Sequence, residues 1–201
     1  MENSKVLTKC IVLAKKNFGE GHLMVTLLTE RYGVIKASAF GGQRLSKRFK
    51  GNLDYFKFIE CELEHKKKNG SNISSITSVK NTLHNFKAIG QSIEKFAAAS
   101  YIQELCAIIL TPNEAKGKSG NNYFLNLYEA LCKLEQQRSQ EDILYTVYDF
   151  SIRLYTDTGF LPELKKMSGA KNIISHLEEF NSRILGITPK SFAVLEKVIN
   201  Q

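Results

Sequence analysis

The spacing of hydrophobic residues changes once along this chain, and that change limits the folds it can form. In residues 53–64 the spacing has a period of two, with Ile59, Cys61 and Leu63 alternating with three glutamates. Beyond residue 84, hydrophobic residues recur at helical spacing instead. We therefore predict an α+β protein, with a strand-forming domain at residues 1–83 and a helical domain at residues 84–201.

Five strands are predicted in the first domain, bounded by glycine-rich or polar turns. Their ranges are residues 6–14, 23–29, 34–40, 53–64 and 73–83. The dipeptide Asn69-Gly70 favours a tight hairpin between the last two strands. Five short strands joined in this way predict a small closed or nearly closed β-barrel of the oligonucleotide-binding (OB) kind.

The second domain is predicted to be built from helices. Hydrophobic residues recur at helical spacing over residues 93–108, 124–131 and 143–154, and Gly159 is placed to end the third helix. Thr188 and Pro189 supply a cap and a first-turn proline for a last helix. Residues 111–122 contain proline, glycine and polar residues, which predicts an exposed loop.

The net positive charge lies entirely in the strand-forming domain. Residues 1–80 carry 15 Lys and Arg against 7 Asp and Glu, whereas residues 81–201 carry 13 of each, so the net charge of +8 belongs to the first part. A basic module joined to a neutral one indicates a polyanionic partner. The cations fall in predicted loops rather than along one face of an amphipathic helix, which favours nucleic acid over a membrane surface.

Three predicted loops carry most of these cations. The densest spans residues 41–51 and contains Phe49, which we expect to stack on a base. The other two join the first strand to the second and the fourth to the fifth, and in an OB barrel such loops border the binding groove. The predicted nucleic-acid contacts are Lys15, Lys16, Arg31, Lys36, Arg44, Lys47, Arg48, Phe49, Lys50, Lys66, Lys67 and Lys68.

No pattern typical of a catalytic or metal site is found. Cys10, Cys61, Cys106 and Cys132 form no C-x-x-C pair, which favours free buried thiols in a reducing cytoplasm. The histidines are scattered, and no phosphate-binding loop or dinucleotide fingerprint is complete. No apolar run approaches the roughly 18 residues of a membrane span. We expect a cytoplasmic protein without enzymatic activity, metal, cofactor or membrane contact.

Three separated segments carry a resemblance to a known family. Residues 11–33 contain an aliphatic strand, a basic pair, the turn Gly19-Glu20-Gly21 and a second strand that ends in Thr-Glu. Residues 96–105 read FAAASYIQEL, and residues 149–164 run from Asp-Phe to Thr-Gly-Phe-Leu-Pro-Glu-Leu. In this order the segments resemble the bacterial DNA repair protein RecO, over about residues 5–165.

The resemblance implies a recombination mediator. Such a protein binds single- and double-stranded DNA, anneals complementary strands and works with RecR to replace single-stranded-DNA-binding protein by RecA. Many family members hold zinc with four cysteines after the Gly-Phe-x-Pro segment, but residues 165–201 contain no cysteine. Residues 166–201 are therefore expected to form a degenerate, zinc-free C-terminal region.

The family also binds the acidic C-terminal tail of single-stranded-DNA-binding protein, mainly through its helical part. A cation beside an aromatic wall suits the terminal carboxylate of such a tail. The residues that we predict for this contact are Arg138, Tyr145, Tyr148 and Arg153.

Two alternatives from other functional classes stay open. The first is an RNA-binding OB-fold protein of translation or ribosome assembly, which would prefer structured RNA to single-stranded DNA. The second is a non-enzymatic adaptor whose basic loops hold an acidic protein, and which would show little salt-dependent affinity for nucleic acid.

Overall fold

The chain is seen here as a computed structural model that describes residues 4–44, 48–49, 51–68, 71–110, 118–160 and 169–199. It contains two compact units. The barrel unit comprises Met1–Asn85 with Leu110–Tyr128, and the helical unit comprises Phe86–Ile109 with Glu129–Gln201. None of the described helices is long and apolar enough to cross a membrane.

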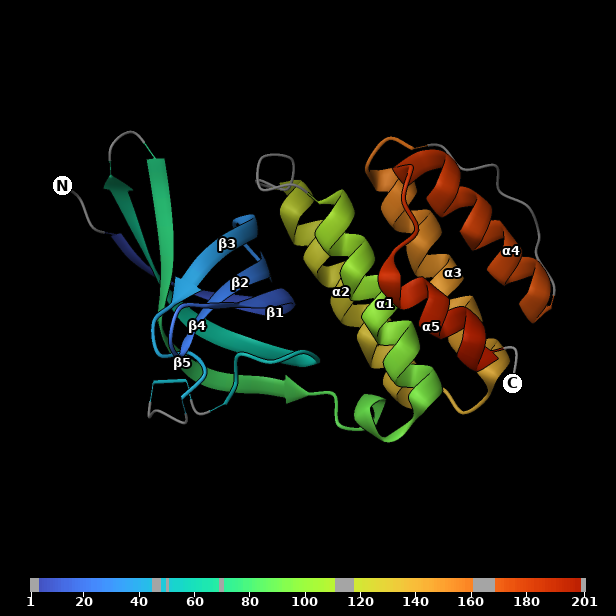
Figure 1. The fold of residues 1–201 in the computed structure, drawn as a ribbon, viewed down its shortest axis with the longest axis horizontal. Helices are drawn as coiled ribbons and strands as arrows, with labels where there is room; N and C mark the ends of the chain where they lie inside the picture. The colour runs from blue at the N-terminus through green and yellow to red at the C-terminus, as the bar shows by residue number, and fades with distance from the viewer. Residues whose placement is uncertain are drawn as a thin grey trace. The chain divides into compact units, whose positions relative to one another are not determined.

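Five strands close into a barrel in the order β1-β2-β3-β5-β4 (Figure 1). Neighbouring strands are antiparallel except β3 and β5, which are parallel and pair at Ala37–Ser74 and Ser38–Ser75. The strands are β1 (Ser4–Phe18), β2 (His22–Thr29), β3 (Gly33–Ala39), β4 (Lys57–Lys68) and β5 (Ser71–Asn85). This is the topology of an OB barrel, and it confirms the predicted α+β class with an N-terminal OB barrel followed by helices.

Two of the basic segments predicted as loops are strand instead. Strand β1 continues through Lys15 and Lys16 to Phe18, because the left-handed backbone needed for the turn occurs only at Gly19 and Gly21, with φ of 59° and 76°. Residues 66–68 likewise continue β4 and pair with residues 71–73 of β5. These paired ends of β4 and β5 project beyond the rest of the barrel (Figure 1).

Strand β4 begins later than predicted, at Lys57 rather than at residue 53. Phe56 has a φ of 56°, a left-handed conformation that interrupts a regular β-strand. Beyond this point the predicted alternation is confirmed, since Ile59, Cys61 and Leu63 are fully buried and the three intervening glutamates are only partly buried.

The helical unit contains one helix that the hydrophobic spacing did not predict, α4, whose buried residues include Ile173, Ile174 and Leu177. A π-helical segment (Asn181–Leu185) follows it directly. Helix α1 packs on α3 and α5, and α3 packs on α4. The helices of the chain are α1 (Ile93–Ile109), α2 (Lys118–Gln136), α3 (Gln140–Asp157), α4 (Ala170–Phe180) and α5 (Lys190–Ile199).

Helix α2 is divided between the two compact units. The structure assigns its residues up to Tyr128 to the barrel unit. There the Phe58 ring of β4 lies 5.5 Å from that of Phe124 and 4.9 Å from that of Tyr128. Helical spacing identifies an apolar face but not the element that it packs against, so the sequence placed this helix with the others. Residues 118–122 of the predicted loop belong to α2, and the rest of that loop includes residues outside the described ranges.

A buried polar cluster joins three segments of the helical unit. The hydroxyl groups of Tyr101 on α1 and Tyr155 on α3 both donate to Oδ1 of Asn181, over 3.0 Å and 2.8 Å. All three residues are fully buried. Burial raises the pKa of Tyr101 to about 12, and it also raises the pKa of Tyr155, because a phenolate is poorly solvated there.

We expect the helical unit to lose stability as the pH rises above about 10. Unfolded tyrosines release their protons near pH 10, whereas folded Tyr101 keeps its proton to about pH 12, so the unfolded state binds fewer protons in this window. Circular dichroism and tyrosinate absorbance should therefore show loss of helix together with late ionisation of the buried tyrosines. Ionisation of all eight tyrosines near pH 10 with the helices intact would contradict this expectation.

Candidate nucleic-acid interface

One face of β1, β2 and β3 points away from the barrel core and combines aromatic, apolar and basic side chains. Cross-strand pairing puts Phe18 beside His22 and Lys16 beside Met24. The pairing of Thr26 with Lys36 adds a second lysine from β3. The alternate residues of β2 are buried in the core, so the set points outward. We call this surface the outer face; its residues are Lys16, Phe18, His22, Met24, Lys36 and Phe40.

Three rings form a continuous group at one end of the outer face. The His22 ring lies 6.5 Å from the Phe18 ring and 5.3 Å, edge to face, from the Phe40 ring. Phe18 is 48% exposed and Phe40 is 52% exposed. Exposed rings beside cations are a feature of surfaces that stack unpaired bases. The site prediction omitted these rings, although both phenylalanines stand next to a glycine turn and could have been noticed there.

Hydrogen bonds hold the segment after β3 against the turn between β1 and β2. The Gly41 N–H donates to Nδ1 of His22 over 2.8 Å, and the Gln43 N–H donates to the Gly21 carbonyl over 3.2 Å. The Gln43 side-chain amide donates to the carbonyl of His22 as well. Because of these bonds, the start of the basic segment lies beside the three rings rather than free in solvent.

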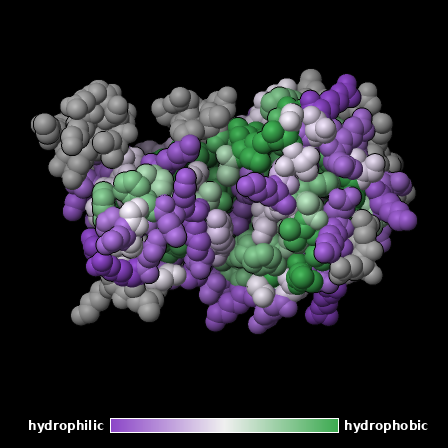
Figure 2. Space-filling view, viewed as in Figure 1, coloured by the Kyte–Doolittle hydropathy of each residue, from purple (hydrophilic) through white to green (hydrophobic). Residues whose placement is uncertain are grey.

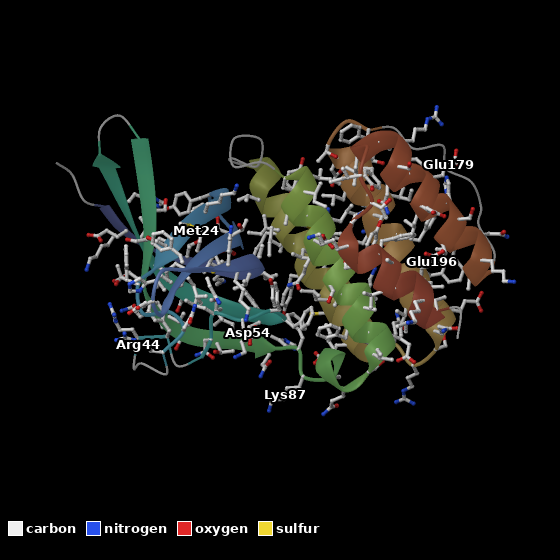
Figure 3. The ribbon with its side chains drawn as sticks, viewed as in Figure 1. Met24, Arg44, Asp54, Lys87, Glu179 and Glu196 are labelled. Atoms are coloured by element: carbon white, nitrogen blue, oxygen red, sulfur yellow. The ribbon has the colours of Figure 1, made fainter. Side chains whose placement is uncertain are left out.

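Arg44 and Arg48 are exposed cations of this segment. Arg44 lies against Gly21, where its Nε is 3.2 Å from the position that a Cβ would take. Figure 3 shows Arg44 projecting from the periphery of the barrel. Nη2 of Arg48 donates to the Phe40 carbonyl over 3.2 Å. Both guanidinium groups thus border the ring group. Figure 2 shows that hydrophilic residues cover much of the visible barrel surface.

Lys15 differs from its neighbour Lys16, because adjacent residues of a strand point to opposite faces. Its Nζ pairs with Oδ1 of Asp54 at 2.5 Å and lies 5.1 Å from the centre of the Tyr55 ring. Desolvation raises the pKa of Asp54, but hydrogen bonds from Lys15 and the Tyr55 N–H outweigh it and keep that pKa below its ordinary value. Both lysines are exposed, but Lys15 is paired with a carboxylate, whereas Lys16 lies on the outer face.

The other predicted cations do not all gather at this place. Arg31 is exposed in the turn after β2, about 23 Å along that strand from His22. Residues 66–68 lie on the projecting end of β4, beyond His65, the last residue that pairs with β1. Lys47 and Lys50 lie outside the described residues.

The expectation that Phe49 stacks on a base is corrected by its position. Its side chain is fully buried within the barrel core, in the cluster that contains Val25, Ile59 and Leu63. The Val79 N–H of β5 donates to the carbonyl of Arg48 over 2.8 Å, which holds this part of the chain against the barrel. A large aromatic residue between cations thus serves here as a core anchor, and the exposed rings are those of the outer face.

The predicted tail-binding residues of the helical unit are not brought to one point. Arg138 precedes α3 and Arg153 lies near its end, about 20 Å along the axis. Arg153 donates to Asp149 over 3.1 Å, in an ion pair of which both side chains are exposed. Tyr145 is 37% exposed, whereas Tyr148 is partly buried and hydrogen-bonded to Nδ1 of His176. One terminal carboxylate cannot contact both arginines.

No group of His, Cys, Asp or Glu in the described ranges is arranged to hold a metal ion. The Sγ atoms of Cys10 and Cys61 lie 3.4 Å apart inside the barrel. The hydrogen bond to Cys61, together with burial, raises the pKa of Cys10, and burial raises that of Cys106. Thiols with raised pKa values are poor nucleophiles and poor metal ligands.

Comparison with known proteins supports the resemblance seen in the sequence. Residues 1–82 match the family model described as "Recombination protein O N terminal". A DNA repair protein RecO of Dehalococcoides mccartyi is 28% identical over 159 residues, which are 79% of this chain and 58% of the relative. A DNA repair protein RecO of Oceanobacillus iheyensis is 27% identical over 170 residues, which are 81% of this chain and 58% of the relative. The chain thus spans less than two thirds of the length of these relatives.

Proposed function

We propose that the chain is a protein of the RecO family that binds DNA in recombinational repair, because residues 1–82 match the family's N-terminal model and RecO proteins are 27–28% identical to about four fifths of the chain. The observation that carries this proposal is the outer face, where exposed Phe18 and Phe40 lie beside cations. Lys16 and Lys36 are exposed on this face, and Arg44 and Arg48 are exposed beside it. All four cations can follow a phosphate backbone. The rings offer apolar surface to bases, which an adaptor for an acidic protein would not need.

The proposed activities are binding of both single- and double-stranded DNA and annealing of complementary strands. Two strands repel each other through their phosphates, and a surface of fixed cations lowers that repulsion by replacing condensed counterions. This process needs no nucleotide hydrolysis and no proton transfer. The function is therefore proposed to be non-enzymatic and independent of metal or cofactor.

The proposed partners are RecR and the acidic tail of single-stranded-DNA-binding protein, through which the chain would help RecA to load. For the tail we propose the helical unit, with Arg138 or Arg153 as alternative contacts for the terminal carboxylate beside Tyr145. Arg153 already forms an ion pair with Asp149, which would compete with the terminal carboxylate of the tail, so we favour Arg138 for this contact. Binding of a fluorescent tail peptide to Arg138→Ala and Arg153→Ala would separate the two, and normal binding by both variants would remove both arginines from the contact.

The test of the proposed function is binding of the purified chain to fluorescent single-stranded DNA across a salt series, with annealing followed in the same samples. We expect a steep loss of affinity with salt and accelerated annealing without ATP. A preference for structured RNA over DNA would favour a role in translation or ribosome assembly. Salt-insensitive, weak binding without annealing would favour the adaptor.

A further inference from the structure

We propose that the rings of Phe18 and Phe40 stack unpaired bases and thereby give the chain a preference for single-stranded over duplex DNA. This inference rests on the proposed DNA binding and adds to it a role for particular side chains. Stacking discriminates between the two forms because the bases of a duplex are already stacked and inaccessible. Exposing a base of a duplex to a protein ring costs a few kcal/mol of unstacking and unpairing.

The first argument is the exposure of the two rings. Each presents about half of its surface to solvent, at 48% for Phe18 and 52% for Phe40, although the barrel has a closed core nearby. They are not isolated, because His22 contacts both and makes the group continuous. On an OB barrel that binds single-stranded nucleic acid, a contiguous aromatic surface is suited to stacking successive bases.

The second argument is that the backbone carrying the two rings is held in place before any ligand binds. Phe18 is in the β1 ladder opposite His22. The backbone around Phe40 is held by two hydrogen bonds, one from Arg48 to its carbonyl and one from the Gly41 N–H to the His22 ring. A backbone that is already ordered loses little conformational entropy on binding, so more of the stacking energy appears as affinity.

The third argument is the position of the cations around the rings. Lys16 lies two residues from Phe18 on the same face of β1, about 7 Å along the strand. Arg48 lies at the other edge of the group, where it donates to the Phe40 carbonyl. A strand that placed its bases on the rings would have basic residues on both sides for its phosphates.

Single substitutions test the proposal. We expect Phe18→Ala and Phe40→Ala each to weaken binding of a single-stranded oligonucleotide by roughly 5- to 150-fold, the range for loss of one stacked base. Duplex affinity should change little. The salt dependence of single-strand binding should keep its slope, because no cation is removed. Phe96→Ala in the helical unit is a matched control, since Phe96 is also 48% exposed, and it should bind as the unmodified chain does.

A second variant reports stacking directly. The chain contains no tryptophan, so Phe40→Trp introduces one indole at the proposed contact. We expect it to keep single-strand affinity and to show fluorescence quenching with single-stranded DNA that is larger than with duplex. Phe96→Trp should show no quenching with either.

The outcomes separate this inference from the proposed function. If the alanine variants fold, as judged by circular dichroism, and bind single strands like the unmodified chain, the rings do not stack bases and the inference is wrong. If the alanine variants lose as much affinity for duplex as for single-stranded DNA, the inference is also wrong. Absence of DNA binding by the unmodified chain would instead remove the proposed function.

Discussion

Replacing Lys16, Lys36, Arg44 and Arg48 together by glutamine is expected to weaken single-stranded DNA binding by about two to three orders of magnitude near 0.1 M salt. Each phosphate contact on a single strand contributes about 0.7 to the slope of log affinity against log salt, so four contacts contribute roughly 2.8. The variant should therefore show a flatter salt dependence as well as a lower affinity. Fluorescence anisotropy across a salt series measures both quantities.

A control with the same change in charge distinguishes contact from overall attraction. Lys171, Arg183, Lys190 and Lys197 are exposed residues of the helical unit. Replacing these four by glutamine removes the same four charges from the net +8. If the salt dependence of the control variant flattens as much as that of the variant at Lys16, Lys36, Arg44 and Arg48, binding depends on total charge and these four cations are not the site.

The second large effect concerns stability rather than binding. Phe49→Ala is expected to destabilise the barrel unit by about 3–5 kcal/mol, because a fully buried aromatic side chain leaves a cavity when it is truncated. Phe49→Leu leaves a smaller cavity and should therefore destabilise the barrel unit less than Phe49→Ala does. Urea unfolding followed by circular dichroism measures both changes.

DNA binding by Phe49→Leu then decides between the two roles considered for this residue. As a core residue, Phe49 has no surface available for a base, so the leucine variant should bind single-stranded DNA with nearly unchanged affinity. A normally stable Phe49→Ala variant with greatly weakened DNA binding would show that this ring is a ligand contact instead.

The barrel could be predicted because its sequence signals are local. Alternation at Ile59, Cys61 and Leu63 identified β4, and glycine turns separated the strands in the right order. The ends of the strands were harder to predict, because the lysines at the ends of β1 and β4 are typical of loops but remain paired within the sheet. Strand β4 begins just after Phe56, and no residue propensity indicates this start, because a left-handed φ at a phenylalanine depends on the surrounding structure.

The site was predicted in part. Charge placed the cations on the first domain, and Lys16, Lys36, Arg44 and Arg48 are exposed on or beside one face of the barrel. Sequence cannot state that the ring within a basic segment turns inward, so it favours Phe49 over the rings of the outer face. That choice depends on the pairing of β3 with β2 and on tertiary packing, which join residues distant in the chain.

The closure of the barrel is uneven, and this has a mechanical consequence. Among the described residues, β3 and β5 pair only at Ala37–Ser74 and Ser38–Ser75, whereas β4 and β5 pair along their whole length. Fewer hydrogen bonds must therefore break to separate β3 from β5 than to separate any other pair of neighbouring strands. The ring of strands therefore has a seam, and amide hydrogens there should exchange with solvent before those of the other ladders. Ser38 lies at this seam, so a transient opening would widen the barrel beside the outer face without unfolding its other ladders.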